Sequence, residues 1–305
     1  MEGYVIKPNF LIVGAAKCGT TSLYHWLKSH PEIYMPERRH KEPTFFVGDE
    51  EYKGEFKSFD SYLKIFHKAG AAKAIGEAST LYLYSKIAPQ KIKKFLGNNV
   101  KIIIMLRDPV KMIYSLWLNN KRELTETLSF EEALEAEEKR FYSQEFRQNK
   151  SLRCPSNFFY TRRTRFLPQI KRYLDEFDRK NILFIKLKDM SKDPEKTYRD
   201  TLEFLDVDYF QMDSFPVKNI SGGFRSSFLT HLMRNYYFRL PFKIIPENFR
   251  QRIAWKIYLW NHMSYKNKPQ TMDQIIENSL RNRFARDINL LEEITDLDLS
   301  DWKGL

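Results

Sequence analysis

An α/β fold of three layers, with a central parallel sheet flanked by helices, is the architecture that this sequence predicts. Short apolar runs recur along the chain, helical patterns lie between them, and no repeat, low-complexity tract or linker interrupts the 305 residues. Strands that alternate with helices form mostly parallel sheets that are covered on both faces. We therefore expect a single domain over residues 1–305.

Four segments carry a strand pattern, and each is a mostly apolar run rather than an alternating one. Runs of this kind are typical of strands that are buried on both faces. The strongest contains three consecutive isoleucines followed by Met105 and Leu106. We expect strands at residues 10–13, 74–76, 101–106 and 181–186.

Helical patterns fill the intervals between these strands. The clearest start signal is Ser129 as an N-cap, with Glu131 and Glu132 in the first turn. We expect helices at residues 22–29, 129–140, 164–177 and 194–205.

The charge balance is strongly basic, with 51 Lys and Arg against 39 Asp and Glu and a formal net charge of +12. The excess suits an anionic partner, although lysines and arginines also simply solvate helix faces. The two cysteines, Cys18 and Cys154, form neither a disulfide framework nor a zinc pattern and fit a reducing compartment. The first residues lack a cleavable apolar segment, and no apolar run approaches the ~20 residues that span a bilayer. We expect a cytoplasmic enzyme without a membrane span, and the oligomeric state is not predicted.

A loop of small and polar residues joins the strand at 10–13 to the helix at 22–29. Its residues are Gly14, Ala15, Ala16, Lys17, Cys18, Gly19, Thr20, Thr21 and Ser22. Free N–H groups at the N-terminus of a helix favour an anion, Lys17 adds positive charge, and the last three residues add hydroxyl donors. The segment predicts a phosphate-binding loop and a P-loop-like form of the three-layer fold.

This loop departs from the nucleoside-triphosphate pattern G-x-x-x-x-G-K-[ST]. Gly14 and Gly19 have the required spacing, but Thr20 stands where that pattern needs lysine. No apolar run ends in a lone Asp suited to hold Mg²⁺. The loop therefore suits a terminal phosphosulfate without a metal better than Mg-ATP, and a P-loop kinase of a small molecule is the alternative.

Three short segments together resemble the first cofactor motif of sulfotransferases that use 3′-phosphoadenosine 5′-phosphosulfate (PAPS), in their heparan-type and bacterial branch. They read Lys17-Cys18-Gly19-Thr20-Thr21-Ser22-Leu23, His30-Pro31-Glu32-Ile33 and Lys41-Glu42-Pro43-Thr44-Phe45-Phe46. The resemblance implies PAPS as donor, 3′-phosphoadenosine 5′-phosphate (PAP) as product, no required metal, and residues 17–22 as ligands of the phosphosulfate. It also implies that Lys17 contacts the bridging oxygen, where negative charge grows as the S–O bond breaks.

A second motif begins where the strand at 101–106 ends. Arg107 lies at the carboxyl end of that strand, where open α/β sheets bind ligands, and Ser115 follows eight residues later. Sulfotransferases share this arrangement, so the resemblance implies that Arg107 and Ser115 bind the 3′-phosphate; the planar fork of arginine suits phosphate. In related enzymes a late loop closes over the nucleotide, and its candidates here are Gly223, Phe224 and Arg225. The tail at 280–302 resembles the closing helix of bacterial members.

The general base is expected at the same edge of the sheet. Glu77 directly follows the strand at 74–76, and the resemblance to heparan-type enzymes implies that it deprotonates the acceptor. Thr80 is followed by Leu81 where relatives often have proline, which leaves the local turn open. His40 and His67 are reserve bases, and Lys41, His40 and Tyr82 are candidates for acceptor contacts. Cys18 is taken as a small loop residue rather than an activated thiol.

We expect transfer of a sulfuryl group to a hydroxyl or amine of a small molecule, such as a natural product, or of a sugar. The segments 120–160 and 231–268 are expected to shape the acceptor site. The second combines aromatic with basic residues, which fits a helical cap or a surface for a membrane or polymer. A second rival function is a non-enzymatic module that binds nucleic acid or acidic glycan there, although no nucleic-acid motif is present and we expect no nucleic-acid partner.

Overall fold

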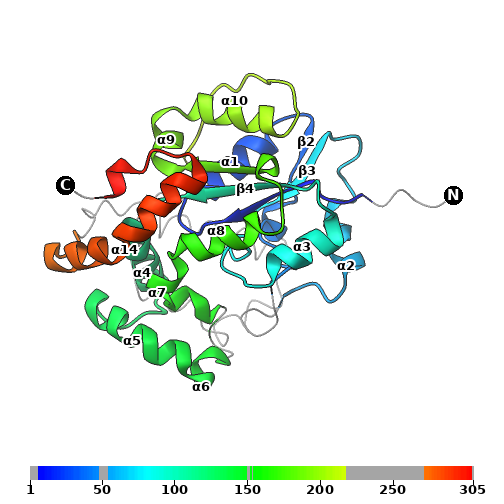
Figure 1. Cartoon of the computed structure of the whole chain (residues 1–305). Helices are drawn as coiled ribbons and strands as arrows, with labels where there is room; N and C mark the ends of the chain where they lie inside the picture. Colours follow the sequence, from blue (N-terminus) through cyan, green and yellow to red (C-terminus); the bar gives the residue numbers. More distant parts are fainter. Residues whose placement is uncertain (1–5, 48–53, 150–151, 153, 218–270, 304–305) are drawn as a thin grey trace.

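A parallel sheet of five strands forms the middle layer of the computed structural model, which describes residues 6–47, 54–149, 152, 154–217 and 271–303 (Figure 1). The strands are β1 (Phe10–Gly14), β2 (Ile33–Tyr34), β3 (Ala74–Glu77), β4 (Lys101–Leu106) and β5 (Ile182–Lys186). Their order is β2-β3-β1-β4-β5, and every neighbouring pair is parallel. The predicted central parallel sheet is confirmed.

The four predicted strands are present, and each agrees with the prediction to within one residue at its ends. β1 reaches Gly14, β3 reaches Glu77, and β5 begins at Ile182. β2 was not predicted because it is only two residues long and pairs with β3 alone, at the edge of the sheet.

Helices cover both faces of the sheet. The α-helices of the described residues are α1 (Thr20–Lys28), α2 (Phe59–Leu63), α3 (Ala88–Leu96), α4 (Pro109–Arg122), α5 (Phe130–Tyr142), α6 (Gln144–Arg147), α7 (Tyr160–Arg163), α8 (Phe166–Leu174), α9 (Leu187–Lys192), α10 (Pro194–Phe204) and α14 (Gln274–Thr295), of which α5 and α6 lie apart from the sheet (Figure 1). The crossover from β1 to β2 runs along the sheet in the opposite sense to the one from β3 to β4. Because such crossovers are right-handed, α1 and α3 lie on opposite faces, and Figure 1 shows α1 and α10 above the strands with α3 and α8 below.

Several helix ends differ from the predictions. α1 begins two residues early, at Thr20, because Gly19 has a left-handed φ of 88° and is itself the N-cap. The helix predicted at 164–177 is shorter and runs as α8. The capping box of Ser129 and Glu132 starts α5 as predicted, although that helix continues to Tyr142.

The closing helix predicted at 280–302 is displaced toward the N-terminus, because it both begins and ends before the predicted residues. α14 starts at Gln274 and stops at Thr295, because Asp296 adopts a left-handed φ of 60°. A separate 3-10 turn, Ser300–Trp302, then buries Trp302. The tail is therefore a helix followed by a turn.

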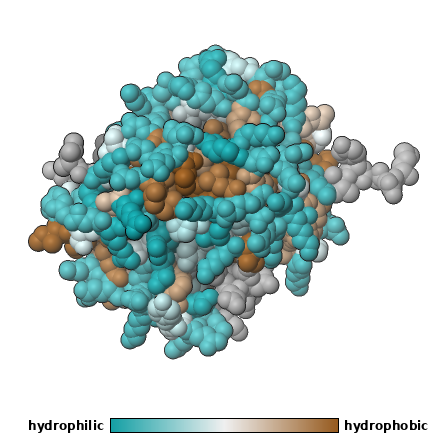
Figure 2. All heavy atoms as spheres, viewed as in Figure 1, coloured by the Kyte–Doolittle hydropathy of each residue, from teal (hydrophilic) through white to brown (hydrophobic). Residues whose placement is uncertain are grey.

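The face in Figure 2 is largely hydrophilic, with an apolar strip across its middle. Within the described ranges, no helix is both long and apolar enough to span a bilayer.

The inner strands are buried throughout, apart from Lys101 of β4. The register aligns Leu11 with Glu77, and Gly14 with Ile104, so the segments that follow β1, β3 and β4 leave the sheet at one edge.

Candidate active site

The loop after β1 leaves the N-terminus of α1 open. Gly19 provides the N-cap without any side-chain hydrogen bond. Its φ of 88° favours glycine, and a Cβ there would lie 2.8 Å from Cδ1 of Leu187. Lys17 also has a positive φ, of 62°, and the loop is tied to β4 by the bond from Ala15 N to Met105 O, 2.7 Å long. Backbone N–H groups at such a helix start favour an anion.

A cavity of about 260 Å³ lies at this helix start. It is lined by both predicted motifs, because α1 follows β1 and α4 follows the neighbouring strand β4. The predicted residues among its lining are Lys17, Gly19, Thr20, Thr21, Ser22, Arg107 and Ser115. Trp26, Met190 and Phe215 add apolar wall. The structure thus brings the two motifs together at one site.

A larger hollow of about 470 Å³ lies against α14 and is lined by polar residues that include Glu277, Arg281 and Asp301. It contains none of the predicted site residues. Of these two cavities, we place the functional site at the smaller one, because it combines a helix N-terminus with partly buried cations and hydroxyl groups.

Arg107 and Ser115 form the part of the cavity that fits a phosphate. Arg107 donates from Nη1 to Lys17 O over 3.3 Å, so the second motif contacts the first directly. The Oγ atom of Ser115 is buried and has no hydrogen-bond partner among the described residues. Buried polar atoms are normally paired, so this hydroxyl is suited to an absent anion. Asp108 fixes the geometry by accepting bonds from Val110 N and Lys111 N at the start of α4.

Lys17 is the partly buried cation of the loop. Its Nζ donates to Oδ1 of Asn119 on α4 over 3.2 Å. Burial first, and then the positive charges of Arg122 and Arg107, together lower the pKa of Lys17 to about 8. The ammonium is therefore still mostly protonated at pH 7.

Cys18 is fully buried, and burial raises the pKa of its thiol to about 12. Its Sγ lies 3.4 Å from Ala16 O, and Cys18 is not among the residues that line the cavity. Any contribution of Cys18 to an anion comes from its backbone.

Among the predicted acceptor residues, Lys41 contacts the phosphate loop. Lys41 donates to Oγ1 of Thr21 over 3.1 Å and pairs with Glu42 at 3.0 Å. The other carboxylate oxygen of Glu42 accepts from Thr80 Oγ1 over 3.0 Å, and the Glu42 side chain is 39% exposed. His40 instead faces Glu55, with 3.5 Å between its Nδ1 and the carboxylate.

Glu77 lies deeper than its predicted role requires. It is fully buried and is absent from the lining of the cavity. Tyr62 donates to its Oε1 over 3.4 Å, whereas Oε2 has no hydrogen-bond partner in the described part of the chain. Burial raises the pKa of Glu77 to about 8, against the opposing effect of the neighbouring Tyr82 and Ser79. Tyr82 is also fully buried.

The remaining predictions have different outcomes. His67 is exposed, and its Nδ1 donates to Lys64 O; it is absent from the lining of the cavity. Gly223, Phe224, Arg225 and the segment 231–268 lie outside the described residues. Among the residues that the structure does describe, no group of three or more His, Cys, Asp or Glu is arranged to hold a metal ion.

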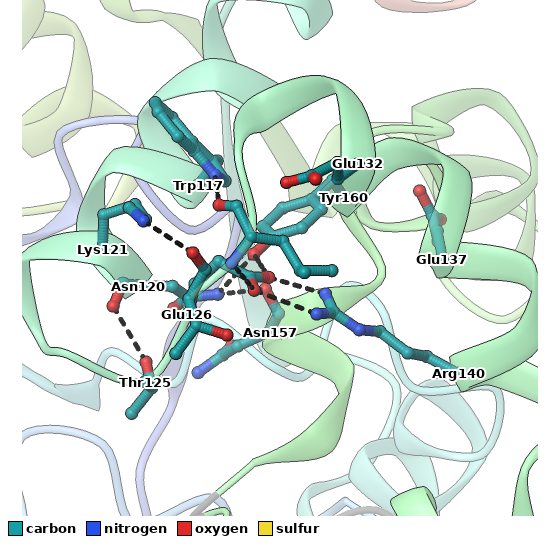
Figure 3. A network of polar contacts seen from close by, with 12 residues as sticks. Trp117, Asn120, Lys121, Thr125, Glu126, Glu132, Glu137, Arg140, Asn157 and Tyr160 are labelled. Carbon is teal, nitrogen blue, oxygen red and sulfur yellow. Dashed lines mark hydrogen bonds and ion pairs between the residues drawn. The ribbon is translucent and has the colours of Figure 1, made fainter.

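Sequence reasoning missed a buried polar network behind α4 (Figure 3). Arg140 donates two bonds to Glu126, at 2.6 and 2.9 Å, and Tyr160 donates a third at 2.8 Å. Asn120 of α4 donates to the Tyr160 hydroxyl over 3.1 Å and to Asn157 O over 2.9 Å. Nothing in the spacing of these residues signals the network, since it joins four separate segments.

Comparisons with known proteins agree with the geometry. The family model described as the sulfotransferase domain matches residues 7–216. A crystal structure of a sulfotransferase from Alicyclobacillus acidocaldarius superimposes with a TM-score of 0.70 and 28% identity, covering 98% of this chain and 100% of that one.

Two curated relatives match over shorter stretches. A mouse protein named bifunctional heparan sulfate N-deacetylase/N-sulfotransferase 1 is 28% identical over 224 residues, which is 69% of this chain and 24% of that protein. The membrane-associated sulfotransferase kil1 of Dictyostelium discoideum is 27% identical over 144 residues, which is 45% of this chain and 30% of that protein. The match therefore spans less than a third of either relative.

Proposed function

Because this chain belongs to the sulfotransferase family, whose donor is PAPS, we propose that it transfers a sulfuryl group to a hydroxyl or amine of a small molecule or sugar. The observation that carries the proposal is the cavity in which Arg107 lies beside the N-terminus of α1, together with a Ser115 hydroxyl that has no hydrogen-bond partner within the described ranges. A donor with phosphate groups at two positions needs two anion sites, and this cavity offers both.

The residues fit the donor in the following way. PAPS, when bound, supplies an activated sulfuryl group and leaves as the bisphosphate PAP. The loop residues 17–22 would hold the phosphosulfate, with Lys17 as the cation that stabilises charge on the leaving oxygen. Arg107 and Ser115 would hold the 3′-phosphate, and we propose Arg225 as a further ligand there. A kinase is less well supported, because Thr20 replaces the lysine of the triphosphate pattern.

Two carboxylates, Glu42 and Glu77, are candidates for the general base. A base must come within hydrogen-bond reach of the acceptor proton. Neither Glu42 nor Glu77 lines the cavity, but Glu42 is the more accessible, since it is partly exposed and its ion-pair partner Lys41 contacts Thr21 of the loop. Glu77, the base proposed from the sequence, is fully buried and would need a rearrangement to reach an acceptor. The geometry therefore favours Glu42.

The acceptor is proposed only as a class. The segments 120–160 and 231–268 are proposed to shape its site, and a natural product with a free hydroxyl or amine suits the aromatic content of the second segment. A reducing, cytoplasmic location is proposed from the two buried cysteines, Cys18 and Cys154, which are free thiols. Fractionation of native cells checks that location.

The test is an assay with ³⁵S-labelled PAPS and a panel of phenols, alcohols and amino sugars. We expect acceptor-dependent release of PAP, and we expect Glu42→Gln to lower kcat by about 100-fold or more while the affinity for PAP is retained. Glu37→Gln is the control, because that side chain is 70% exposed.

Each outcome of this assay separates the candidates. If Glu77→Gln abolishes turnover and Glu42→Gln does not, Glu77 is the base. Release of PAP in no condition, together with phosphorylation of an acceptor from Mg-ATP, would replace the sulfotransferase assignment with the kinase.

A further inference from the structure

Asn119 lies between two cations at the edge of the loop. Its side-chain Oδ1 accepts from Lys17 Nζ over 3.2 Å and from Arg122 Nη2 over 2.7 Å. Asn119 is four residues beyond Ser115 on α4, so both side chains lie on the same face of that helix. The helix thus contributes one group to the proposed phosphate site and another to the lysine of the loop.

The uncharged amide oxygen of Asn119 can hold two cations close together, because it accepts a hydrogen bond from each of them. Lys17 and Arg122 repel each other, and each must give up water to lie in this partly buried position. One amide oxygen offers each cation a hydrogen bond without neutralising it. A carboxylate in the same place would form a charge-assisted pair, which competes with any anion for the lysine.

The charges that face Lys17 come from two elements. They are Arg107 from the end of β4 and Arg122 and Glu123 from the end of α4, and the neutral thiol of Cys18 in the loop is a further titratable neighbour. The two arginines lower the pKa of Lys17, and Glu123 raises it. None of these groups forms a hydrogen bond with Nζ, so Asn119 is the polar contact that fixes the ammonium among the described residues.

The network in Figure 3 fixes the helix turn that carries Asn119. Its neighbour Asn120 is 5% exposed and is held by Asn157 O and by the hydroxyl of Tyr160. That hydroxyl in turn donates to Glu126, which Arg140 holds from the other side. A buried and fully paired network of this kind restricts the rotation and translation of the last turn of α4.

We infer that Asn119 is a positioning residue for sulfuryl transfer, whose amide oxygen holds the Lys17 ammonium beside the Arg122 guanidinium at the phosphate loop. The inference deepens the proposed function and rests on it. Lys17 remains a full cation that is oriented but not neutralised. Arg122, held on the same oxygen, is brought into the same anion-binding region.

The test measures the pKa of Lys17 in the ligand-free protein, by NMR of ¹³C-methylated lysines, with Lys17→Arg to assign the signal. Asn119→Leu removes the acceptor, so the pKa is expected to fall. Asn119→Asp keeps the shape and adds an opposite charge, so the pKa is expected to rise by about 1 unit or more. Asn181→Asp adds the same charge at the far end of β5, and we expect no shift from it.

The second readout is the alkaline limb of kcat/KM against pH with PAPS. This limb should shift to lower pH in Asn119→Leu and to higher pH in Asn119→Asp. A merely structural role would not produce two shifts in opposite directions. An unchanged pKa of Lys17 in both variants overturns the inference. If the pKa moves as expected but the wild type never uses PAPS, the positioning contact stands and the proposed function fails.

Discussion

At the scale of single residues, burial decides the chemistry of the two carboxylates near the site. Glu42 is paired and partly exposed, whereas Glu77 is fully buried beside Tyr62 and Tyr82. A buried carboxyl without a cation favours its neutral form. Glu77 is therefore expected to act as a neutral hydrogen-bonding group at pH 7.

This difference predicts a pH-dependent gain of stability in Glu77→Gln. The folded pKa of Glu77, about 8, lies above its unfolded value, so the wild type loses free energy of unfolding as the pH rises from about 4.5 through 8. Glutamine does not titrate. The stability of the variant relative to the wild type should therefore rise over that window, by on the order of 5 kcal/mol at most.

Urea denaturation of both proteins at pH 5, 7 and 9 measures this gain. All other titrating groups are shared, so the difference isolates Glu77. Parallel stability curves across the three pH values would show that the carboxyl is already ionised in the folded protein.

The sequence predicted the residues of the cavity better than those of its surroundings. Lys17, Arg107 and Ser115 follow parallel strands, and parallel strands place such segments at one edge. The contact of Lys17 with Asn119 depends on the rotation of α4 about its axis, which composition does not reveal. The burial of Glu77 depends on chain segments that pack over it, so its strand-end position alone was misleading about its depth.

At the scale of elements, α4 connects the cavity to the rest of the fold. It starts at Pro109 with Asp108 as its cap, and its residues Ser115 and Asn119 face the loop. Its far end is held by hydrogen bonds from Asn120 to Asn157, just before α7, and to Tyr160, the first residue of α7. The position of the cavity residues on α4 therefore depends on packing at both ends of the helix.

Breaking the Glu126–Arg140 pair should destabilise the protein strongly. The Glu126 side chain is 1% exposed and that of Arg140 is 13% exposed, and despite burial the hydrogen bonds from Arg140 hold the pKa of Glu126 below its usual range. Removal of one partner leaves the other charge buried, so Glu126→Gln or Arg140→Met should cost about 2–4 kcal/mol. Chemical denaturation measures this cost.

The matched control is the exposed pair of Lys196 and Asp200 on α10, where Asp200→Asn should cost less than about 1 kcal/mol. The double variant Glu126→Leu with Arg140→Met should be less damaged than the sum of the single variants, because no unpaired charge remains. A Glu126→Gln cost equal to that of Asp200→Asn would contradict the role of this network.

The elements were predictable where a local signal existed. The apolar runs gave the inner strands, and the capping box gave the start of α5. β2 was not predicted because two residues carry no periodicity. The end of α14 was not predicted because Asp296 adopts its left-handed φ in a tertiary context.

At the scale of the whole molecule, the strand order explains why two distant motifs form one site. β1 and β4 are neighbours in the middle of the sheet, so the segments after them share the central part of one edge. The C-terminal part of the chain supports the same edge, because Arg281 of α14 reaches Asp108 over 3.4 Å and Trp302 O over 3.2 Å. The net charge of +12 adds a general attraction for an anionic nucleotide.

The central claim is that this edge binds a nucleotide with a 3′-phosphate, and calorimetric titration of PAP against adenosine 5′-monophosphate tests it most directly. The two ligands differ only in that phosphate. We predict that the wild type binds PAP about 100-fold more tightly, and that Arg107→Ala removes most of this preference while the exposed Lys111→Ala keeps it. Equal affinity for the two ligands, or tighter binding of Mg-ATP than of PAP, would contradict the account.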